Sequence, residues 1–224
     1  MARMHEKRVR DAEASRKRLL EAGVKVFSEC GPDGGSVSMI ARAAGINRRM
    51  LYHYFGSKEG LYRAAFRHAY EQLSSAEVEL ADMALNAEDL LVRMIRSYYE
   101  FHATHPHHVR LLMWENLRQG KVASDMRLGA IKTPILDALR IALARGKAEG
   151  RFRRDVDEKH LLISCMGMCF FCFSNRHTIS QALGFDLVAP GAVERCIHHD
   201  VRLLLEGIRV KKSGRSKRVK GEPS

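Results

Sequence analysis

The sequence predicts an all-α protein of two domains, and three observations support that prediction. The chain of 224 residues contains only 5 prolines, and most of its 17 glycines fall between segments of helical periodicity. No stretch keeps the period-two alternation of apolar and polar residues that is typical of a half-buried strand. The composition, 46% hydrophobic and 29% charged, is that of a globular protein and excludes collagen-like, mucin-like and acidic solvating chains.

The first two expected elements are helices joined by a turn. Apolar residues recur at three- and four-residue steps over 12–30, which predicts an amphipathic helix, and the sequence GPDGG at 31–35 ends it. Ser36 is the expected N-cap of a second helix, because a serine hydroxyl accepts a hydrogen bond from an N–H group of the first turn. This second helix is short and ends at Gly45.

The remaining helices follow from their caps and breaks. Asn47 caps a third short helix that closes near Gly56, and Ser57 caps a longer fourth helix. Glu59 lies in the first turn of this fourth helix, where a carboxylate suits the helix dipole. Beyond residue 80 the breaks lie at proline and glycine positions, and the predicted helices cover residues 87–104, 106–118, 122–149, 157–183 and 191–210.

Residues 36–55, SVSMIARAAGINRRMLYHYF, have the pattern of a helix-turn-helix. The second helix of this motif can lie in the major groove of DNA, where its first residues reach base edges. Here that helix begins Asn47-Arg48-Arg49, and arginine can bind guanine with two hydrogen bonds while asparagine can pair with adenine. The pattern therefore predicts a sequence-specific DNA-binding domain.

The charge distribution favours the same partner. The net charge is +12, and residues 1–60 contribute +5, residues 61–208 contribute +1 and residues 209–224 contribute +6. Both ends are basic and the body is nearly neutral, which favours an anionic partner at the N-terminal segment. Residues 211–224 are highly charged and poor in apolar residues, so we expect a disordered basic tail there.

The stretch 13–73, above all IARAAGINRRMLYHYFGSKEGLY, resembles the DNA-binding domain of the TetR family of transcriptional regulators. The family pattern reads roughly I-A-x-x-A-G-V-S-x-x-x-L-Y-x-Y/H-F-x-S-K-E-x-L. The matching positions are Ile40, Ala41, Ala44, Gly45, Leu51, Tyr52, Tyr54, Phe55, Ser57, Lys58, Glu59 and Leu61. This resemblance is specific, although it covers only the first third of the chain.

The resemblance implies roles in DNA binding by position. Ser36 and Lys58 would bind phosphates, and Tyr54 would hold the DNA backbone. With the groove-facing positions, the implied DNA-binding residues are Ser36, Asn47, Arg48, Arg49, Tyr52, His53, Tyr54 and Lys58. Asn47 stands where the family usually has Ser or Thr, and Arg49-Met50 stands where many members have small residues. The base preference of a relative therefore does not carry over.

For residues 74–210 the resemblance implies a helical domain that binds a ligand and dimerises. The segment 105–117, HPHHVRLLMWENL, is similar to a piece found in some members. Apolar and aromatic residues that could line a pocket, or simply pack the core, are Tyr98, Phe101, His102, Met113, Trp114, Met126, Met166 and Phe170. The family pattern places the last two long helices at a two-fold axis, and the apolar stripe expected there is Val193, Ile197, Val201, Leu204 and Ile208.

Two alternatives remain open from the residues alone. Cys165, Cys169 and Cys172 have the spacing of an iron–sulfur loop, so an enzyme that holds a metal through them or through the histidines is one alternative. A DNA-binding protein that senses thiol oxidation is the other. Buried cysteines behave as small hydrophobic residues, and no G-x-S-x-G, Walker or G-x-G-x-x-G sequence is present. We therefore expect no enzymatic activity, no cofactor and no metal site.

The expected protein is thus a homodimeric, ligand-responsive repressor that binds a palindromic operator in double-stranded DNA. We expect it in the cytoplasm, because the basic start MARMHEKRVR is not followed by the apolar core of a signal peptide. The apolar run 161–173 is too short to span a membrane, and five cysteines form no disulfide framework. Because residues 61–208 are nearly neutral, we expect an apolar or weakly polar organic effector.

Overall fold

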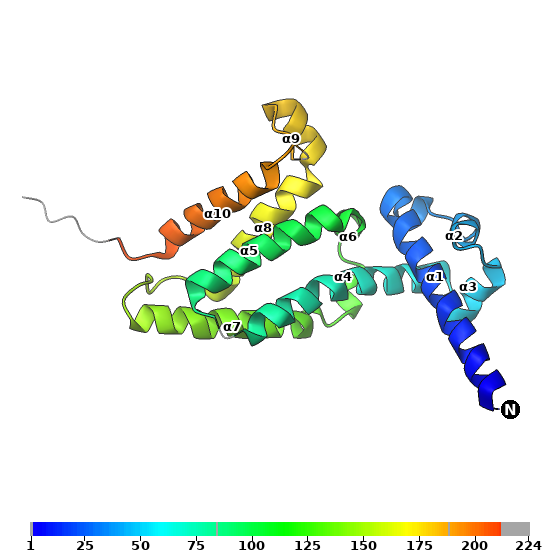
Figure 1. Ribbon diagram of the computed structural model, residues 1–224. Helices are drawn as coiled ribbons and strands as arrows, with labels where there is room; N and C mark the ends of the chain where they lie inside the picture. The colour runs from blue at the N-terminus through cyan, green and yellow to red at the C-terminus, as the bar shows by residue number, and fades with distance from the viewer. Residues whose placement is uncertain (1, 84, 188, 212–224) are drawn as a thin grey trace, which may run out of the picture.

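A computed structural model describes residues 2–83, 85–187 and 189–211. Within this part of the chain the elements are helical, apart from an isolated bridge between Phe152 and Arg209. Figure 1 shows α1–α3 at one end of the molecule and the later helices stacked beside one another at the other end. The helices are α1 Ala2–Gly34, α2 Val37–Ala44, α3 Arg48–Phe55, α4 Lys58–Asp82, α5 Ala87–Thr104, α6 Pro106–Leu117, the 3-10 helix η1 Ala123–Asp125, α7 Leu128–Ala148, α8 Glu158–Ser174, α9 Arg176–Leu183 and α10 Ala192–Ile208.

The prediction of an all-α chain with an N-terminal helix-turn-helix is confirmed, and the helix caps are those expected. The side chains of Ser36, Asn47 and Ser57 each accept a hydrogen bond from an N–H group in the first turn of the helix that follows. Gly45 ends α2 with a φ of 62°, a left-handed conformation that only glycine adopts at little cost. Of these positions, Gly45 and Asn47 define the turn between α2 and α3.

Three of the predicted helices differ clearly from those in the structure. Helix α1 begins at residue 2 rather than 12, and it extends to Gly34 with a non-helical break at Gly31. The helix expected over 122–149 begins only at Leu128, because the chain first forms η1 and then turns. The helix expected over 157–183 is two helices, because the backbone of Asn175 leaves helical geometry between α8 and α9, with φ −110° and ψ 14°.

The chain buries two hydrophobic cores, and α4 passes through both. The core around α1–α3 includes Leu51 and Phe66, and the core of the C-terminal helices includes Leu73 and Leu139. The domain boundary expected between 73 and 74 thus lies inside α4. Three residues from beyond α5 join the N-terminal core, namely Leu111, Val122 and Met126. The tail expected at 211–224 lies outside the described residues except for its first position.

Candidate nucleic-acid interface and effector pocket

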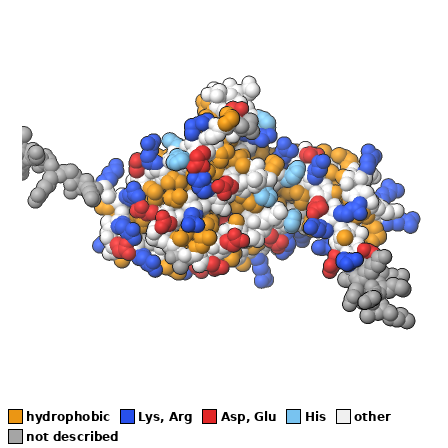
Figure 2. Space-filling view, in the orientation of Figure 1, with side chains coloured by type: hydrophobic (Ala, Val, Ile, Leu, Met, Phe, Trp, Pro, Cys, Tyr) orange, Lys and Arg blue, Asp and Glu red, His pale blue; other side chains and the backbone are white. Residues whose placement is uncertain are grey.

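Helix α3 presents the residues that the sequence assigned to DNA. Arg48, Arg49, Tyr52 and His53 are exposed on its surface. Figure 2 shows that Lys and Arg side chains gather at the end of the molecule formed by α1–α3. Because α3 is short and its first turn carries two exposed arginines, it has the shape and charge of a helix that enters the major groove.

The other four predicted contacts are partly engaged within the chain. The Ser36 hydroxyl accepts the Met39 N–H at 3.2 Å, and the Asn47 Oδ1 accepts the Arg49 N–H at 2.9 Å. In both caps the side-chain oxygen is the acceptor, so the NH₂ group of the Asn47 amide remains free to reach a base. Tyr54 and Lys58 are half-buried, and the Lys58 Nζ donates to the carbonyl of Asp33 at 3.4 Å.

Arg18 fixes the turn of the helix-turn-helix, a role that the sequence analysis missed. Its Nη2 donates to the carbonyl of Ala44 at 2.5 Å and to that of Gly45 at 3.4 Å. A guanidinium at the C-terminus of α2 satisfies a carbonyl that the helix leaves without a partner, and its charge suits the helix dipole. Arg16 lies over the ring of Phe55, with 5.2 Å to the ring centroid. Helix α1 thereby holds both α2 and α3 in place.

A cavity of about 440 Å³ opens between the end of α5, α6 and the junction of α8 with α9. It is the size of a small-molecule site. Two of the eight residues that the sequence suggested for a pocket, His102 and Met113, line it. The described residues around the cavity are His102, Ala103, Pro106, Val109, Arg110, Met113, Phe173, Ser174, Arg176, His177, Leu187 and Val193.

The other six suggested pocket residues lie elsewhere in the fold. Trp114 packs on α1, where its Nε1 donates to the carbonyl of Ser28 at 3.3 Å, and Met126 belongs to the N-terminal core. Phe101 stacks on the His105 ring with centroids 4.2 Å apart. The remaining three are core residues or neighbours of the cavity wall: Tyr98, Met166 and Phe170.

A buried polar cluster lies beside the cavity. The carboxylate of Glu77 accepts hydrogen bonds from the Tyr98 hydroxyl and from the Lys132 ammonium, both at 2.5 Å. Burial, followed by the charge of Glu77, raises the pKa of Tyr98. The ring of His108 donates a hydrogen bond through Nδ1–H to the carbonyl of Ala69. Its Nε2 has no hydrogen-bond partner among the described residues.

Helix α6 joins this region to the DNA-binding domain. The buried carboxylate of Glu115 accepts the Tyr62 hydroxyl of α4 at 3.0 Å. It also accepts the N–H groups of Val122 and Ala123, at 2.5 and 2.9 Å. Burial and the nearby Glu115 charge raise the pKa of Tyr62, so its hydroxyl remains a donor. One side of α6 therefore lines the cavity while another is bonded to the helix that follows α3.

The stripe expected at a dimer interface packs against the chain's own core, and its role between subunits stays a prediction. Ile197 is 2% exposed and Ile208 5%, and both belong to the C-terminal core. The other three residues of the stripe pack partly buried against the same core: Val193, Val201 and Leu204. The reason is that α10 packs along α5, which uses the apolar face of α10 within the subunit.

Helix α8 carries an exposed apolar face in this domain. Ile163 is 64% exposed and Phe171 58%, and Gly167 lies between them at the four-residue spacing of one helix face. Leu203 of α10 is exposed as well. A Cβ placed on Gly167 would meet no atom within 4 Å, so another helix has room to approach closely there.

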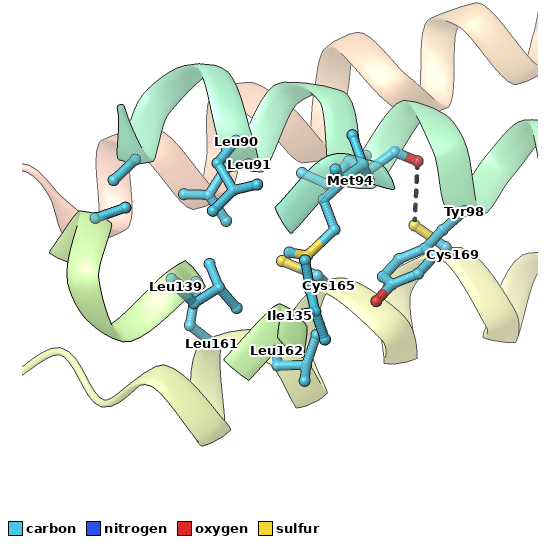
Figure 3. Close-up of a cluster of buried hydrophobic side chains, with 14 of the residues drawn as sticks. Leu90, Leu91, Met94, Tyr98, Ile135, Leu139, Leu161, Leu162, Cys165 and Cys169 are labelled. Atoms are coloured by element: carbon cyan, nitrogen blue, oxygen red, sulfur yellow. Dashed lines mark hydrogen bonds between the residues drawn. The ribbon is translucent and has the colours of Figure 1, made fainter. Parts of the chain in front are cut away.

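The structure gives the cysteines the surroundings of core residues. Cys165 and Cys169 are buried between α5 and α8, where Figure 3 shows Cys165 beside Met94 and Cys169 beside Tyr98, and the Cys169 thiol points to the carbonyl of Ile95. Burial raises the pKa of Cys165 to about 12 and raises that of Cys169 as well, which disfavours the reactive thiolate. No group of three or more His, Cys, Asp or Glu side chains in the described ranges could hold a metal ion.

The fold and the exposed α3 define a helix-turn-helix DNA-binding protein with a separate helical domain, and comparison with known proteins gives its family. The family model "Bacterial regulatory proteins, tetR family" matches residues 19–65, and "Tetracyclin repressor-like, C-terminal domain" matches residues 88–203. The chain belongs to the TetR family of transcriptional regulators, and it is a sequence-specific DNA-binding regulator. The resemblance inferred from residues 13–73 is thus confirmed, and it extends into the C-terminal domain.

Individual relatives span nearly the whole chain. The HTH-type transcriptional repressor NicS of Pseudomonas putida is 34% identical over 203 residues, which are 90% of this chain and 96% of that protein. The HTH-type transcriptional regulator RutR of Escherichia coli is 26% identical over 208 residues, 91% of this chain and 94% of that protein. The structure of FadR from Bacillus subtilis in complex with stearoyl-CoA superposes with a TM-score of 0.66 at 21% identity, covering 86% of this chain and 98% of that one.

None of the described helices is long and apolar enough to cross a membrane.

Proposed function

We propose that the protein is a homodimeric repressor that binds a palindromic operator and leaves it when a small molecule enters the cavity beside α6. The observation that carries this proposal is the exposed first turn of α3, with Arg48 and Arg49 free on a helix whose position Arg18 and the caps hold. The repressor NicS, which is similar over 90% of this chain, supports negative regulation as the direction of control.

The proposed contacts divide into base-reading and positioning groups. Arg48, Arg49 and the Asn47 amide would reach base edges in the major groove, because they head the groove-facing helix. Tyr54 and Lys58 would bind phosphates, which fix the register of the protein without reading sequence. Lys58 is the first residue of α4, where the helix N-terminus adds to the attraction for a phosphate.

We further propose that α8 forms the centre of the dimer interface. Ile163, Gly167 and Phe171 form an apolar face that the subunit leaves uncovered, and Leu203 of α10 lines a surface depression together with Ser164 of α8. A two-fold contact here would bury the same face of both subunits. It would hold two α3 helices at a spacing that matches half-sites about one helical turn apart.

The regulation follows from the position of α6. A ligand that contacts Val109 and Met113 touches the same helix whose Glu115 is bonded to α4. A ligand that binds better when α6 is shifted would favour a state with the wrong spacing of the α3 helices, by no more than its differential affinity for the two states. By reciprocity, the operator must weaken ligand binding by the same factor.

The experiment that tests the proposal starts with selection of bound sequences from a random DNA pool. With the operator in hand, Arg48→Ala and Arg49→Ala are compared with Arg140→Ala, which removes an exposed arginine from α7. At least one of the first two should lose about 1–3 kcal/mol of operator binding and little of random-DNA binding. Lys58→Ala should weaken both and lower the salt slope by about one unit. Equal losses on operator and random DNA for both α3 variants would refute base reading by this helix.

A further inference from the structure

The cavity beside α6 is lined by positively charged side chains, although the domain around it is nearly neutral. Arg110 of α6 and Arg176, the first residue of α9, both line it, together with the imidazole of His177. The described lining residues include no Asp or Glu. The domain around it is nearly neutral, so the composition of the chain conceals a local site with two guanidinium groups and no acidic counterpart.

His102 adds a polar group to the apolar end of this cavity. The side chain is only 5% exposed, its Nδ1 is fully buried, and no hydrogen bond from Nδ1 to any described residue exists. Burial, followed by the charges of His108 and Lys132, lowers the pKa of His102 to about 3, so the imidazole is neutral at pH 7. The buried Nδ1 is out of reach of solvent, so a bound molecule can meet only the part of the ring that lines the cavity.

The remaining walls are apolar. Val109, Met113, Phe173, Leu187 and Val193 surround the space between these polar groups. At about 30 Å³ for each water-sized group, a cavity of about 440 Å³ holds a body of about 15 non-hydrogen atoms. This volume suits a compact organic molecule and is too small to enclose a coenzyme A thioester.

We propose that the cavity binds a compact organic monocarboxylate, with its carboxylate between Arg110 and Arg176 and its apolar body against Phe173 and Val109. Arg110 and Arg176 are half-buried whereas His102 is buried, so the desolvation cost of a carboxylate is lower beside the two arginines. The N-terminus of α9 carries no side-chain cap, so its free N–H groups also favour an anion. His102 forms a hydrogen bond to a polar atom of the body at the buried end.

This assignment rests on the proposed function for its regulatory meaning, and it adds a charged group to the apolar or weakly polar effector that the sequence favoured. A carboxylate held by both arginines would join α6 to α9, two elements far apart in the sequence. Since α6 is also bonded to α4 through Glu115, binding at Arg110 would bias the position of the DNA-binding domain. The chemistry of the ligand thus gives the differential affinity that regulation requires.

The test uses the full-length protein and matched pairs of probes. Benzoate, phenylacetate and hexanoate are each compared with the corresponding carboxamide, which keeps the shape and removes the charge, and with the coenzyme A thioester. Affinities are measured by isothermal titration calorimetry for the wild type, Arg110→Met, Arg176→Met and the double variant. Arg140→Met serves as the control for loss of one positive charge outside the cavity.

In the wild type at least one carboxylate should bind about tenfold or more tightly than its carboxamide, as expected for charge-assisted hydrogen bonds. That ratio should fall toward one in the double variant and stay unchanged in Arg140→Met. His102→Phe should weaken carboxylates that carry a further polar atom, such as a hydroxybenzoate, more than benzoate itself.

Three results would overturn the assignment: carboxamides or thioesters that bind as tightly as the carboxylates, a preference that survives in the double variant, or no carboxylate bound below about 1 mM. Operator binding is measured separately for each variant. Selection of an operator together with release by neutral compounds would leave the proposed function standing and the carboxylate assignment refuted. If the protein binds carboxylates as expected but selects no operator from the DNA pool, the proposed function is refuted and the carboxylate assignment stands.

Discussion

Replacement of Glu115 by alanine should detach α6 from the DNA-binding domain. The change leaves three donors without their acceptor, namely the Tyr62 hydroxyl and the N–H groups of Val122 and Ala123. A hydrogen bond to a charged group contributes about 1.5–3 kcal/mol, and removal of the buried carboxylate also relieves its desolvation cost. We therefore expect the free energy of unfolding to fall by about 3–5 kcal/mol, a large share of the stability of an ordinary domain.

The assay is urea unfolding followed by far-UV circular dichroism, at one fixed protein concentration because a dimer is stabilised by mass action. Two control variants should lower the free energy of unfolding by smaller amounts. Tyr62→Phe removes only the hydroxyl and should cost about 1 kcal/mol, whereas Glu115→Gln keeps one oxygen for the N–H groups and should fall between the two. If Glu115→Ala costs less than about 1 kcal/mol, the carboxylate does not hold these elements together and the coupling through α6 is refuted.

Three further outcomes follow from the structure. Ile163→Glu should give a monomer in sedimentation while Ile141→Glu, at an α7 position that is equally exposed (60%), should not; a dimeric Ile163→Glu would contradict the α8 interface. Burial lowers the pKa of His102 to about 3 and of His108 to about 4 from 6.5, so the unfolded chain takes up protons first as the pH falls. Stability should be full above pH 6.5 and decline below it by up to about 1.4 kcal/mol per pH unit and histidine, and a urea midpoint equal at about pH 7 and pH 5 would show that these rings are not buried. Arg18→Met should cost about 1 kcal/mol of stability and also weaken operator binding, because the α2 C-terminus loses its donor, and unchanged operator affinity would exclude Arg18 from positioning α3.

The parts of the fold that could be predicted from the sequence are those in which cause and effect are close in the chain. Ser36, Asn47 and Ser57 bond to N–H groups only two or three residues away, so their residue type already specifies a helix start. The same holds for Gly45, whose left-handed backbone ends α2. These residues were therefore enough to predict where α2 ends and where α3 and α4 begin.

The parts that the sequence did not predict depend on long-range partners. The periodicity of α10 shows that one face is buried, but not whether a partner subunit or the chain's own α5 covers it. Trp114 and Ser28 are 86 positions apart, and nothing near Trp114 indicates that it packs on α1 rather than in a pocket. The charge of the cavity was not predicted for a similar reason. Arg110 and Arg176 line one cavity only in the folded domain, and in the net charge of the domain acidic residues elsewhere cancel them.

The unbroken course of α4 through both cores has a consequence for the engineering of hybrid regulators. An α-helix turns by about 100° and rises by about 1.5 Å for each residue. One residue inserted between Leu73 and Ser74 would therefore rotate the whole DNA-binding end by about 100° and pull Tyr62 away from Glu115. Seven inserted residues restore the rotation to within about 20° but move that end by about 10 Å. A chimaera of two such regulators should keep helical phase and length across its junction, and it should take α6 from the same parent as the first half of α4.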